Sequence, residues 1–243
     1  MIRLSPQDRV FILTGAGVSA ESGLATFRGA GGLWQGYRVE EVACPEAWAR
    51  DPLLVWQFYS MRRRAAADKK PNPGHYALAR LEEQLGERLV VCTQNVDELH
   101  ELAGSRRVLH MHGRLFQSRC DRCDGGPFED RGTYEHAVPR CHCGGRLRPH
   151  ICWFGEMPYE LERIDQEMER CTVFVAVGTS GVVYPAAGLV AQARVKGVRT
   201  YYVGPEEPAN SRLFSECFYG KAGEILPGLF LITTQGTGER RGS

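Results

Sequence analysis

Four short, continuously apolar segments that alternate with helix-like segments constrain the fold of this chain more than any other feature. The apolar segments are rich in β-branched and aromatic residues, and they occupy 9–17 (RVFILTGAG), 88–95 (RLVVCTQN), 172–180 (TVFVAVGTS) and 199–204 (RTYYVG). The helix-like segments occupy 52–70, 73–85, 159–171 and 185–197. This alternation predicts an α/β fold with a Rossmann-like, doubly wound parallel sheet.

The stretch 116–149 breaks this pattern, because it is rich in Cys, Gly, Asp and Arg and poor in aliphatic residues. Its spacing is Cys-x2-Cys, seventeen residues, then Cys-x-Cys, and it contains four of the nine cysteines of the chain. Four thiolates at such spacing are typical of a closed, tetrahedral and structural zinc site. We therefore predict one structural Zn²⁺ in a small inserted module, with His142 as a weaker candidate ligand. The predicted ligands are Cys120, Cys123, Cys141 and Cys143.

Charge and hydropathy limit the possible partners. The 243 residues carry a net charge of +1, with 43% hydrophobic and 24% charged residues, which is typical of a soluble globular protein. No apolar run approaches the roughly 18–20 residues of a transmembrane helix, and MIRLSPQDRV at the N-terminus lacks a signal-peptide core. We expect a cytoplasmic monomer that binds neither nucleic acid nor membrane.

Polar motifs follow the predicted strands directly, at the sheet edge where parallel α/β folds bind ligands. GAGVSAESG (15–23) has the Gly-x-Gly-x-x-Ala spacing that brings backbone close to a pyrophosphate, although such glycines also form ordinary turns. The acidic ribose-binding residue usual about 20 residues later is missing. A glycine-rich loop (25–34) follows instead, and it is either a lid over a nucleotide or an irregular surface loop.

Two further motifs offer catalytic side chains. TQNVDELH (93–100) places Gln94, Asn95 and Asp97 just after a strand, where Asp97 could also be a helix N-cap. LHMHGRLF (109–116) contains His110 and His112, which face the same way in an extended segment. The glycine after His112 allows close approach of a ligand, and the two histidines compete for one role.

Taken together, seven stretches resemble the sirtuin family of NAD-dependent protein-lysine deacylases, and they span roughly residues 10–228. In chain order they are GAGVSAESGLATFRG, TQNVDELH, HMHG, the two cysteine pairs, LRPHICWFGE, VGTSGVVYPAA and GKAGEILP. The resemblance implies that NAD is consumed as a co-substrate, that the partners are acylated-lysine proteins or peptides, and that the products are nicotinamide, 2′-O-acyl-ADP-ribose and free lysine.

The resemblance also implies roles for individual residues. His112 would be the catalytic base, Asn95 and Asp97 would hold the nicotinamide amide, and Gln94 would hold a ribose. The NAD site would comprise Gly15, Ala16, Gly17, Ala20, Glu21, Thr26, Phe27, Arg28, Trp34, Gln94, Asn95, Val96, Asp97, Gly178, Thr179, Ser180, Gly204 and Ala222. The substrate peptide would be clamped as an added strand by Cys152, Phe154, Gly155 and Glu156, facing Val182 and Val183.

The implied domain organisation follows from these assignments. A Rossmann-like NAD-binding domain comprises 1–35, 71–115 and 150–232, and residues 36–70 form the helical part of a small domain. The zinc-binding module is 116–149, and 233–243 is a flexible tail. The chain departs from the family pattern at Cys-x-Cys in place of Cys-x-x-Cys, at Gly204 in place of asparagine and at Ala25 in place of proline.

The stretch FYSMRRR (58–64) bears on the acyl group. Tyr59 and Arg62 are three residues apart and would share a helix face, next to an apolar run that implies partial burial. We expect Arg63 and Arg64 to be solvated. In sirtuins, a Tyr-x-x-Arg pair here resembles the mark of members that prefer succinyl-, malonyl- or glutaryl-lysine, together with a small residue such as Ala30. A guanidinium can hold a carboxylate with two parallel bonds.

Four alternatives stay open at this point. The chain could be a plain NAD-dependent deacetylase, a mono-ADP-ribosyltransferase, or a non-catalytic module that binds NAD or ADP-ribose. It could also be a zinc-ribbon nucleic-acid binder, which the near-neutral charge and the long α/β body disfavour.

Overall fold

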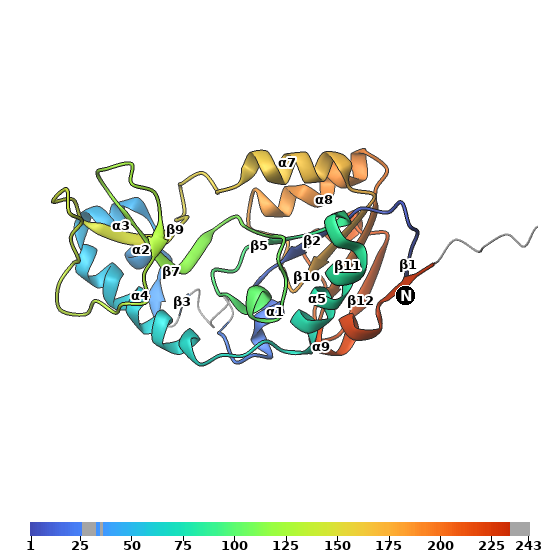
Figure 1. Ribbon diagram of the computed structural model, residues 1–243, viewed down its shortest axis with the longest axis horizontal. Coiled ribbons are helices and arrows are strands. Elements are labelled where there is room, and N and C mark those ends of the chain that lie inside the picture. The colour runs from blue at the N-terminus through green and yellow to red at the C-terminus, as the bar shows by residue number, and fades with distance from the viewer. Residues whose placement is uncertain (26–32, 35, 234–243) are drawn as a thin grey trace, which may run out of the picture.

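The computed structural model describes residues 1–25, 33–34 and 36–233. Figure 1 shows a parallel sheet flanked by helices at one end of the long axis and a smaller lobe at the other. The predicted site residues Thr26, Phe27, Arg28 and Ala30 lie outside the described residues, and only the backbone of Trp34 is described.

Within the described residues, the central sheet has six parallel strands in the order β12-β11-β10-β2-β5-β6. This is the Rossmann strand order, in which the direction of chain progression reverses between β2 and β10. A crevice is expected beyond the carboxyl ends at that reversal. The strands are β2 (Val10–Thr14), β5 (Leu89–Thr93), β6 (Val108–His110), β10 (Val173–Val177), β11 (Arg199–Gly204) and β12 (Glu216–Tyr219).

Helices cover both faces of this sheet, because its strands are apolar on both sides. Val10 and Ile12 pack against α5 and α9 in one buried cluster, whereas Phe11 and Leu13 pack against α7 and α8 in another. The predicted doubly wound α/β fold is confirmed. The covering helices are α5 (Pro73–Leu85), α7 (Leu161–Arg170), α8 (Ala186–Val195) and α9 (Ala222–Ile225).

The two longest described helices begin at side-chain caps. The carboxylate of Asp51 accepts a hydrogen bond from the N–H of Leu54 (2.9 Å) at the start of α4 (Pro52–Ala67), and the amide oxygen of Asn72 accepts one from Gly74 (2.9 Å) at the start of α5. In each helix a proline occupies the first position, where no N–H is needed.

The small lobe consists of helices α2–α4 and an antiparallel sheet of order β8-β7-β9 (Figure 1). One buried cluster joins the two parts, with Trp48, Trp56 and Phe58 from the helices and Leu115 and Phe116 from β7. The cysteine-rich segment therefore shares a core with the helices. The remaining elements of the lobe are α2 (Val39–Val42), α3 (Pro45–Arg50), β7 (Gly113–Cys120), β8 (Phe128–Glu129) and β9 (Leu147–Ile151).

Short elements complete the described chain. β1 pairs in parallel with β13, and β3 pairs with β4. None of the helices in the described part is long and apolar enough to span a membrane. The short elements are β1 (Ile2–Leu4), α1 (Ala16–Ala20), β3 (Leu33–Trp34), β4 (Tyr37–Arg38), α6 (Leu99–Leu102) and β13 (Phe230–Ile232).

Candidate active site

A cavity of about 870 Å³ lies where the carboxyl ends of β2, β5 and β10 face the small lobe. It brings together most of the predicted site residues whose side chains are described. Those in its lining are Gly15, Ala16, Gly17, Tyr59, Arg62, Gln94, Asn95, Val96, Asp97, His112, Cys152, Phe154, Gly155, Glu156, Gly178, Thr179, Ser180, Val182 and Val183.

Glycines allow two loops to touch at the floor of this cavity. The N–H of Gly17 donates to the carbonyl of Gly178 (2.8 Å), and the N–H of Gly15 donates to the carbonyl of Val177 (3.0 Å). A Cβ on Gly17 would lie 2.7 Å from the Cα of Gly178, which is closer than real Cβ atoms come. The floor is therefore bare backbone, as a close-bound pyrophosphate requires.

A polar cluster lies behind the loop that follows β5. The side-chain amide of Asn95 donates to the carbonyl of Gly15 and to the hydroxyl of Ser19 (both 3.1 Å), and Ser19 donates to the carboxylate of Asp97 (3.0 Å). Asp97 also accepts from the N–H of Leu99 (3.1 Å), so it caps the local turn as well. Sequence reasoning did not select Ser19, although its place inside the glycine motif was a signal.

The two histidines have different surroundings. Nδ1 of His112 lies 3.0 Å from the carbonyl oxygen of Gln94, which can only accept, so Nδ1 carries the proton and Nε2 keeps its lone pair. Burial lowers the pKa of His112, although the bond to Gln94 opposes this, so the ring is neutral near pH 7. His110 uses both nitrogens, toward the carbonyl of Asn95 (3.3 Å) and the carboxylate of Glu101 (2.7 Å). Only His112 lines the cavity.

Tyr59 and Arg62 both line the cavity, on the helix face they were expected to share. The hydroxyl of Tyr59 accepts from the indole N–H of Trp153 (3.0 Å), and this bond does not use the proton of the hydroxyl itself. Burial raises the pKa of Tyr59 to about 12. Burial lowers the pKa of Arg62, whereas Tyr59 and the carboxylate of Asp97 act to raise it.

The expectation for Arg63 was wrong. Arg63 is buried, with 1% of its surface exposed, and it pairs with Asp130 (3.2 Å) on the inner side of the small lobe. Three charged residues in a row gave no sign that one of them points inward. Arg64 is exposed as expected and pairs with Glu135.

The segment after β9 forms another side of the cavity. Both carboxylate oxygens of Glu156 accept from Arg148 (2.7 and 2.9 Å), and one also accepts from the N–H of Trp153 (2.9 Å), so Glu156 fixes this turn from within. Phe154 and Val182 stand at the rim, with 47% and 54% of their surfaces exposed.

Four of the predicted NAD-site residues that the structure describes do not line the cavity: Ala20, Glu21, Gly204 and Ala222. Glu21 accepts from the N–H of Gly223 (2.7 Å), and Ala222 is buried in the core. A Cβ at Gly204 would lie 2.2 Å from the hydroxyl of Tyr202, so any larger residue there would force the ring of Tyr202 to shift. Tyr202 lines the cavity, and sequence reasoning did not select it.

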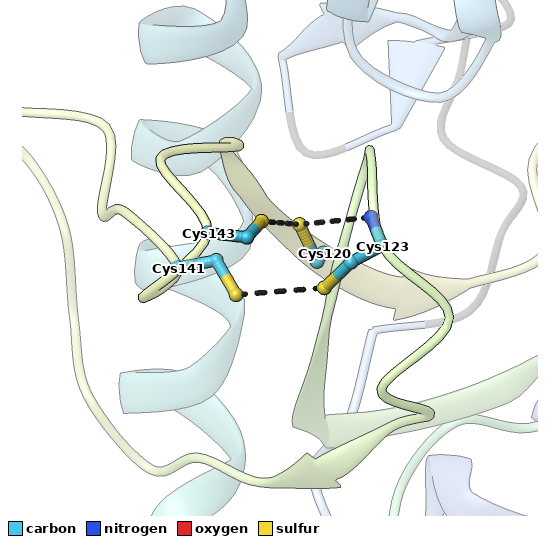
Figure 2. Close-up of side chains that lie close together, drawn as sticks. All are labelled: Cys120, Cys123, Cys141 and Cys143. Atoms are coloured by element: carbon cyan, nitrogen blue, oxygen red, sulfur yellow. Dashed lines mark hydrogen bonds between the residues drawn. The ribbon is translucent and has the colours of Figure 1, made fainter.

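Figure 2 shows Cys120, Cys123, Cys141 and Cys143 pointing toward one another. Their sulfur atoms all lie within 4.8 Å of one another, with 3.5 Å between Cys120 and Cys143 and 3.7 Å between Cys123 and Cys141. A tetrahedral zinc with Zn–S bonds of about 2.3 Å needs sulfurs about 3.8 Å apart. The four thiols thus fit one structural zinc, and the Cys-x-Cys spacing accommodates the site.

Comparisons with known proteins identify relatives of the chain. The Sir2 family model matches residues 15–185. The chain is 48% identical over 227 residues to an NAD-dependent protein deacylase of Caulobacter vibrioides, covering 90% of this chain and 94% of the relative. It is similar to a Sir2 homologue in complex with NAD, with 42% identity and a TM-score of 0.84, covering 91% of this chain and 88% of that chain. It is also similar to a Sir2 variant with a deacetylated p53 peptide and 3′-O-acetyl ADP ribose (29% identity, TM-score 0.81, 90% of each chain covered).

Proposed function

The chain belongs to the Sir2 family and is an NAD-dependent protein deacylase, and on this premise we propose that it removes succinyl and malonyl groups from lysine in preference to acetyl groups. The observation that carries this proposal is the position of Tyr59 and Arg62, which line the same cavity as His112.

NAD, the co-substrate, would lie along the carboxyl edge of the sheet. The pyrophosphate would rest on the backbone of Gly15, Gly17 and Gly178, where an added Cβ on any of the three would meet backbone of the facing loop. Asn95 and Asp97 would hold the nicotinamide amide. Gln94, whose side chain donates to Thr179 (3.1 Å), would hold a ribose, and Thr179 and Ser180 would contact the adenosine half.

His112 is proposed as the general base. The acyl-lysine oxygen first displaces nicotinamide from the ribose, and Nε2 of His112 then takes a proton from a ribose hydroxyl. That hydroxyl attacks the acyl carbon, and water completes the release of free lysine and 2′-O-acyl-ADP-ribose. The bond from Nδ1 to the carbonyl of Gln94 supports this role, because it holds the ring in the tautomer that can accept a proton at Nε2.

The acyl preference would come from charge and hydrogen bonding. The guanidinium of Arg62 can hold a carboxylate with two parallel bonds, and the hydroxyl of Tyr59 can donate a third. A hydrogen bond to a charged group contributes about 1.5–3 kcal/mol, or roughly 10- to 150-fold in rate. An acetyl group cannot make these bonds, so acetyl-lysine would be the poorer substrate.

The substrate peptide would add as a strand between the segment after β9 and the loop that contains Val182 and Val183. Support comes from Phe154 and Val182, which both line the cavity and are both exposed.

A comparison of acetyl-, malonyl-, succinyl- and glutaryl-lysine on one peptide tests the proposal, with kcat/KM measured from nicotinamide release. We expect succinyl-lysine to exceed acetyl-lysine, and Arg62→Met with Tyr59→Phe to lose desuccinylation by about tenfold or more while largely keeping deacetylation. Equal kcat/KM values for the unmutated protein, or an equal loss of both activities, would indicate a plain deacetylase. A protein that gains ADP-ribose would indicate a transferase.

A further inference from the structure

Helix α4 carries two adjacent rows of side chains with different tasks. One row begins with Trp56 and Ser60, and its residues are four and then three positions apart, so they share one helix face. This row makes hydrogen bonds to the zinc-bearing part of the small lobe. The indole N–H of Trp56 donates to the carbonyl of Leu147 (2.8 Å), and the hydroxyl of Ser60 accepts from the N–H of Tyr134 (2.7 Å). The next residue of this row is Arg63. The second row lines the cavity and includes Tyr59, Arg62 and Ala66, with Ala65 beside them.

Arg63 makes the densest set of bonds in the first row. Its guanidinium donates to the carbonyls of Leu115 (2.8 Å) and Gln117 (3.1 Å) on β7 and to the carbonyl of Gly132 (2.7 Å) in the loop that follows β8. It also stacks on the ring of Trp56, 5.0 Å from the centroid. A buried guanidinium is tolerated only when its charge and donors are matched, so these bonds permit few positions of the helix.

The charge partner of Arg63 belongs to the segment between the two cysteine pairs. The carboxylate of Asp130 faces the guanidinium at 3.2 Å. Asp130 is itself held by the hydroxyl of Ser118 (2.5 Å), the N–H of Gly132 (2.9 Å) and the hydroxyl of Tyr134 (3.0 Å). A continuous set of bonds therefore leads from the zinc-bearing segment to the middle of α4.

We propose that Arg63 is a positioning residue for substrate binding, which anchors α4 to the zinc-bearing segment and thereby holds Tyr59 and Arg62 in the cavity. The proposal rests on the proposed function in one respect, namely that the acyl chain enters beside these two side chains. Because Arg62 and Arg63 are adjacent on one helix, a rotation or tilt that releases Arg63 displaces Arg62 as well. The floor that faces the co-substrate is formed by other elements and keeps its shape.

The experiment compares Arg63→Gln with Arg64→Gln, a matched loss of an exposed arginine one position along the helix. KM is measured for NAD and for whichever acyl-peptide the unmutated protein uses best, with zinc content determined for each variant. We expect Arg63→Gln to raise the acyl-peptide KM by roughly tenfold, or about 1.4 kcal/mol, with the KM for NAD within about twofold and zinc retained. Arg64→Gln should change neither constant.

A second variant keeps the proposal testable if Arg63→Gln does not fold. Asp130→Asn removes the ion pair but leaves the bonds from Arg63 to the three carbonyls, so the same selective rise in acyl-peptide KM should appear with smaller size. Unchanged KM values, or equal rises for NAD and for acyl-peptide in a folded, zinc-loaded variant, overturn the proposal. Absence of a succinyl preference in the unmutated protein instead overturns the proposed function, and the KM comparison still decides the role of Arg63.

Discussion

The floor and the helical wall of the cavity are built by different means. The floor consists of loops at the ends of β2, β5 and β10, where glycine backbones touch and the sheet beneath is packed on both faces. The wall consists of side chains on α4, and that helix is held both by an apolar cluster shared with β7 and by polar bonds to a cysteine-bearing segment. A floor of this kind tolerates few added atoms, whereas the wall depends on single side chains and on a metal.

This difference suggests a division of labour. Under the proposed function, the floor would bind the co-substrate and the wall would bind the acyl group. Treatments that disturb one side should leave the other largely intact, and the three predictions that follow test this separation.

Removal of zinc should have the largest effect, and it should disturb the helical wall of the cavity. Structural zinc contributes about 10–16 kcal/mol in small zinc-dependent peptides, and the segment between the cysteine pairs has little apolar surface of its own. We expect Cys141→Ser to lose zinc, to unfold the small lobe and to abolish turnover. Hydrogen exchange should show α4 and β7–β9 exposed while β2, β5 and β10 stay protected.

Cys92→Ala is a suitable control for that experiment, because Cys92 is buried in the sheet core and far from the zinc ligands in sequence. Elemental analysis should find one zinc per chain in this control and in the unmutated protein. A Cys141→Ser variant that is fully active and equally stable would contradict the prediction.

The next largest effect should come from His112, at the junction of β6 and β7. Loss of a general base lowers turnover by roughly 10²–10⁴-fold, or about 3–5 kcal/mol. We expect His112→Ala to show this fall with NAD binding largely kept, as measured by calorimetry. His110→Gln, which changes the histidine bonded to Glu101, should retain most turnover, and the assignment is wrong if the two variants behave the other way round.

The floor could be predicted from sequence to a greater extent than the wall. The strands that end in GAG, TQN and GTS were apparent from apolar runs followed by polar residues, and the four thiols from their spacing. The choice between His110 and His112 could not come from residue type, because it depends on which carbonyls and carboxylates the rings meet. Resemblance to a family favoured His112, and the bond from its Nδ1 to the carbonyl of Gln94 supports that proposal.

Residues that act through distant partners were missed. Arg63 appears in sequence as one of three equal arginines, and its burial depends on Asp130, 67 positions away, and on carbonyls of β7. Gly204 appeared as a departure from the family pattern, in place of asparagine, whereas the structure shows that the ring of Tyr202 fills the space where a side chain would begin. Pairwise packing of this kind has no periodic signature in one sequence.

The smallest effect should come from acidic pH, which should lower the stability of the buried region beneath the floor of the cavity. His75 and His100 are buried against each other, with ring centroids 4.9 Å apart, and Nε2 of His100 lies 3.0 Å from the hydroxyl of Thr14 at the end of β2. Burial lowers the pKa of His75 to about 4 and that of His100 to about 3. Near pH 7 both rings are therefore neutral in the folded protein.

In the unfolded chain both imidazoles titrate near their ordinary pKa of about 6.5, so below that pH the unfolded state binds more protons. Stability from these groups is thus complete above about pH 6.5 and is lost as the pH falls toward about 4 for His75 and about 3 for His100. Each ring should lower the free energy of unfolding by about 2 kcal/mol between pH 7 and pH 5.

Urea unfolding at these two pH values should show this loss of stability. His75→Asn, which keeps an acceptor near the N–H of Asn72, should make the loss smaller by about 2 kcal/mol. Chelation of zinc at pH 7 should leave the amides of β2 and β5 protected from hydrogen exchange, whereas pH 5 with zinc retained should reduce their protection. If acid lowers the stability of the unmutated protein and of the His75→Asn variant equally, the acid-sensitive groups lie elsewhere.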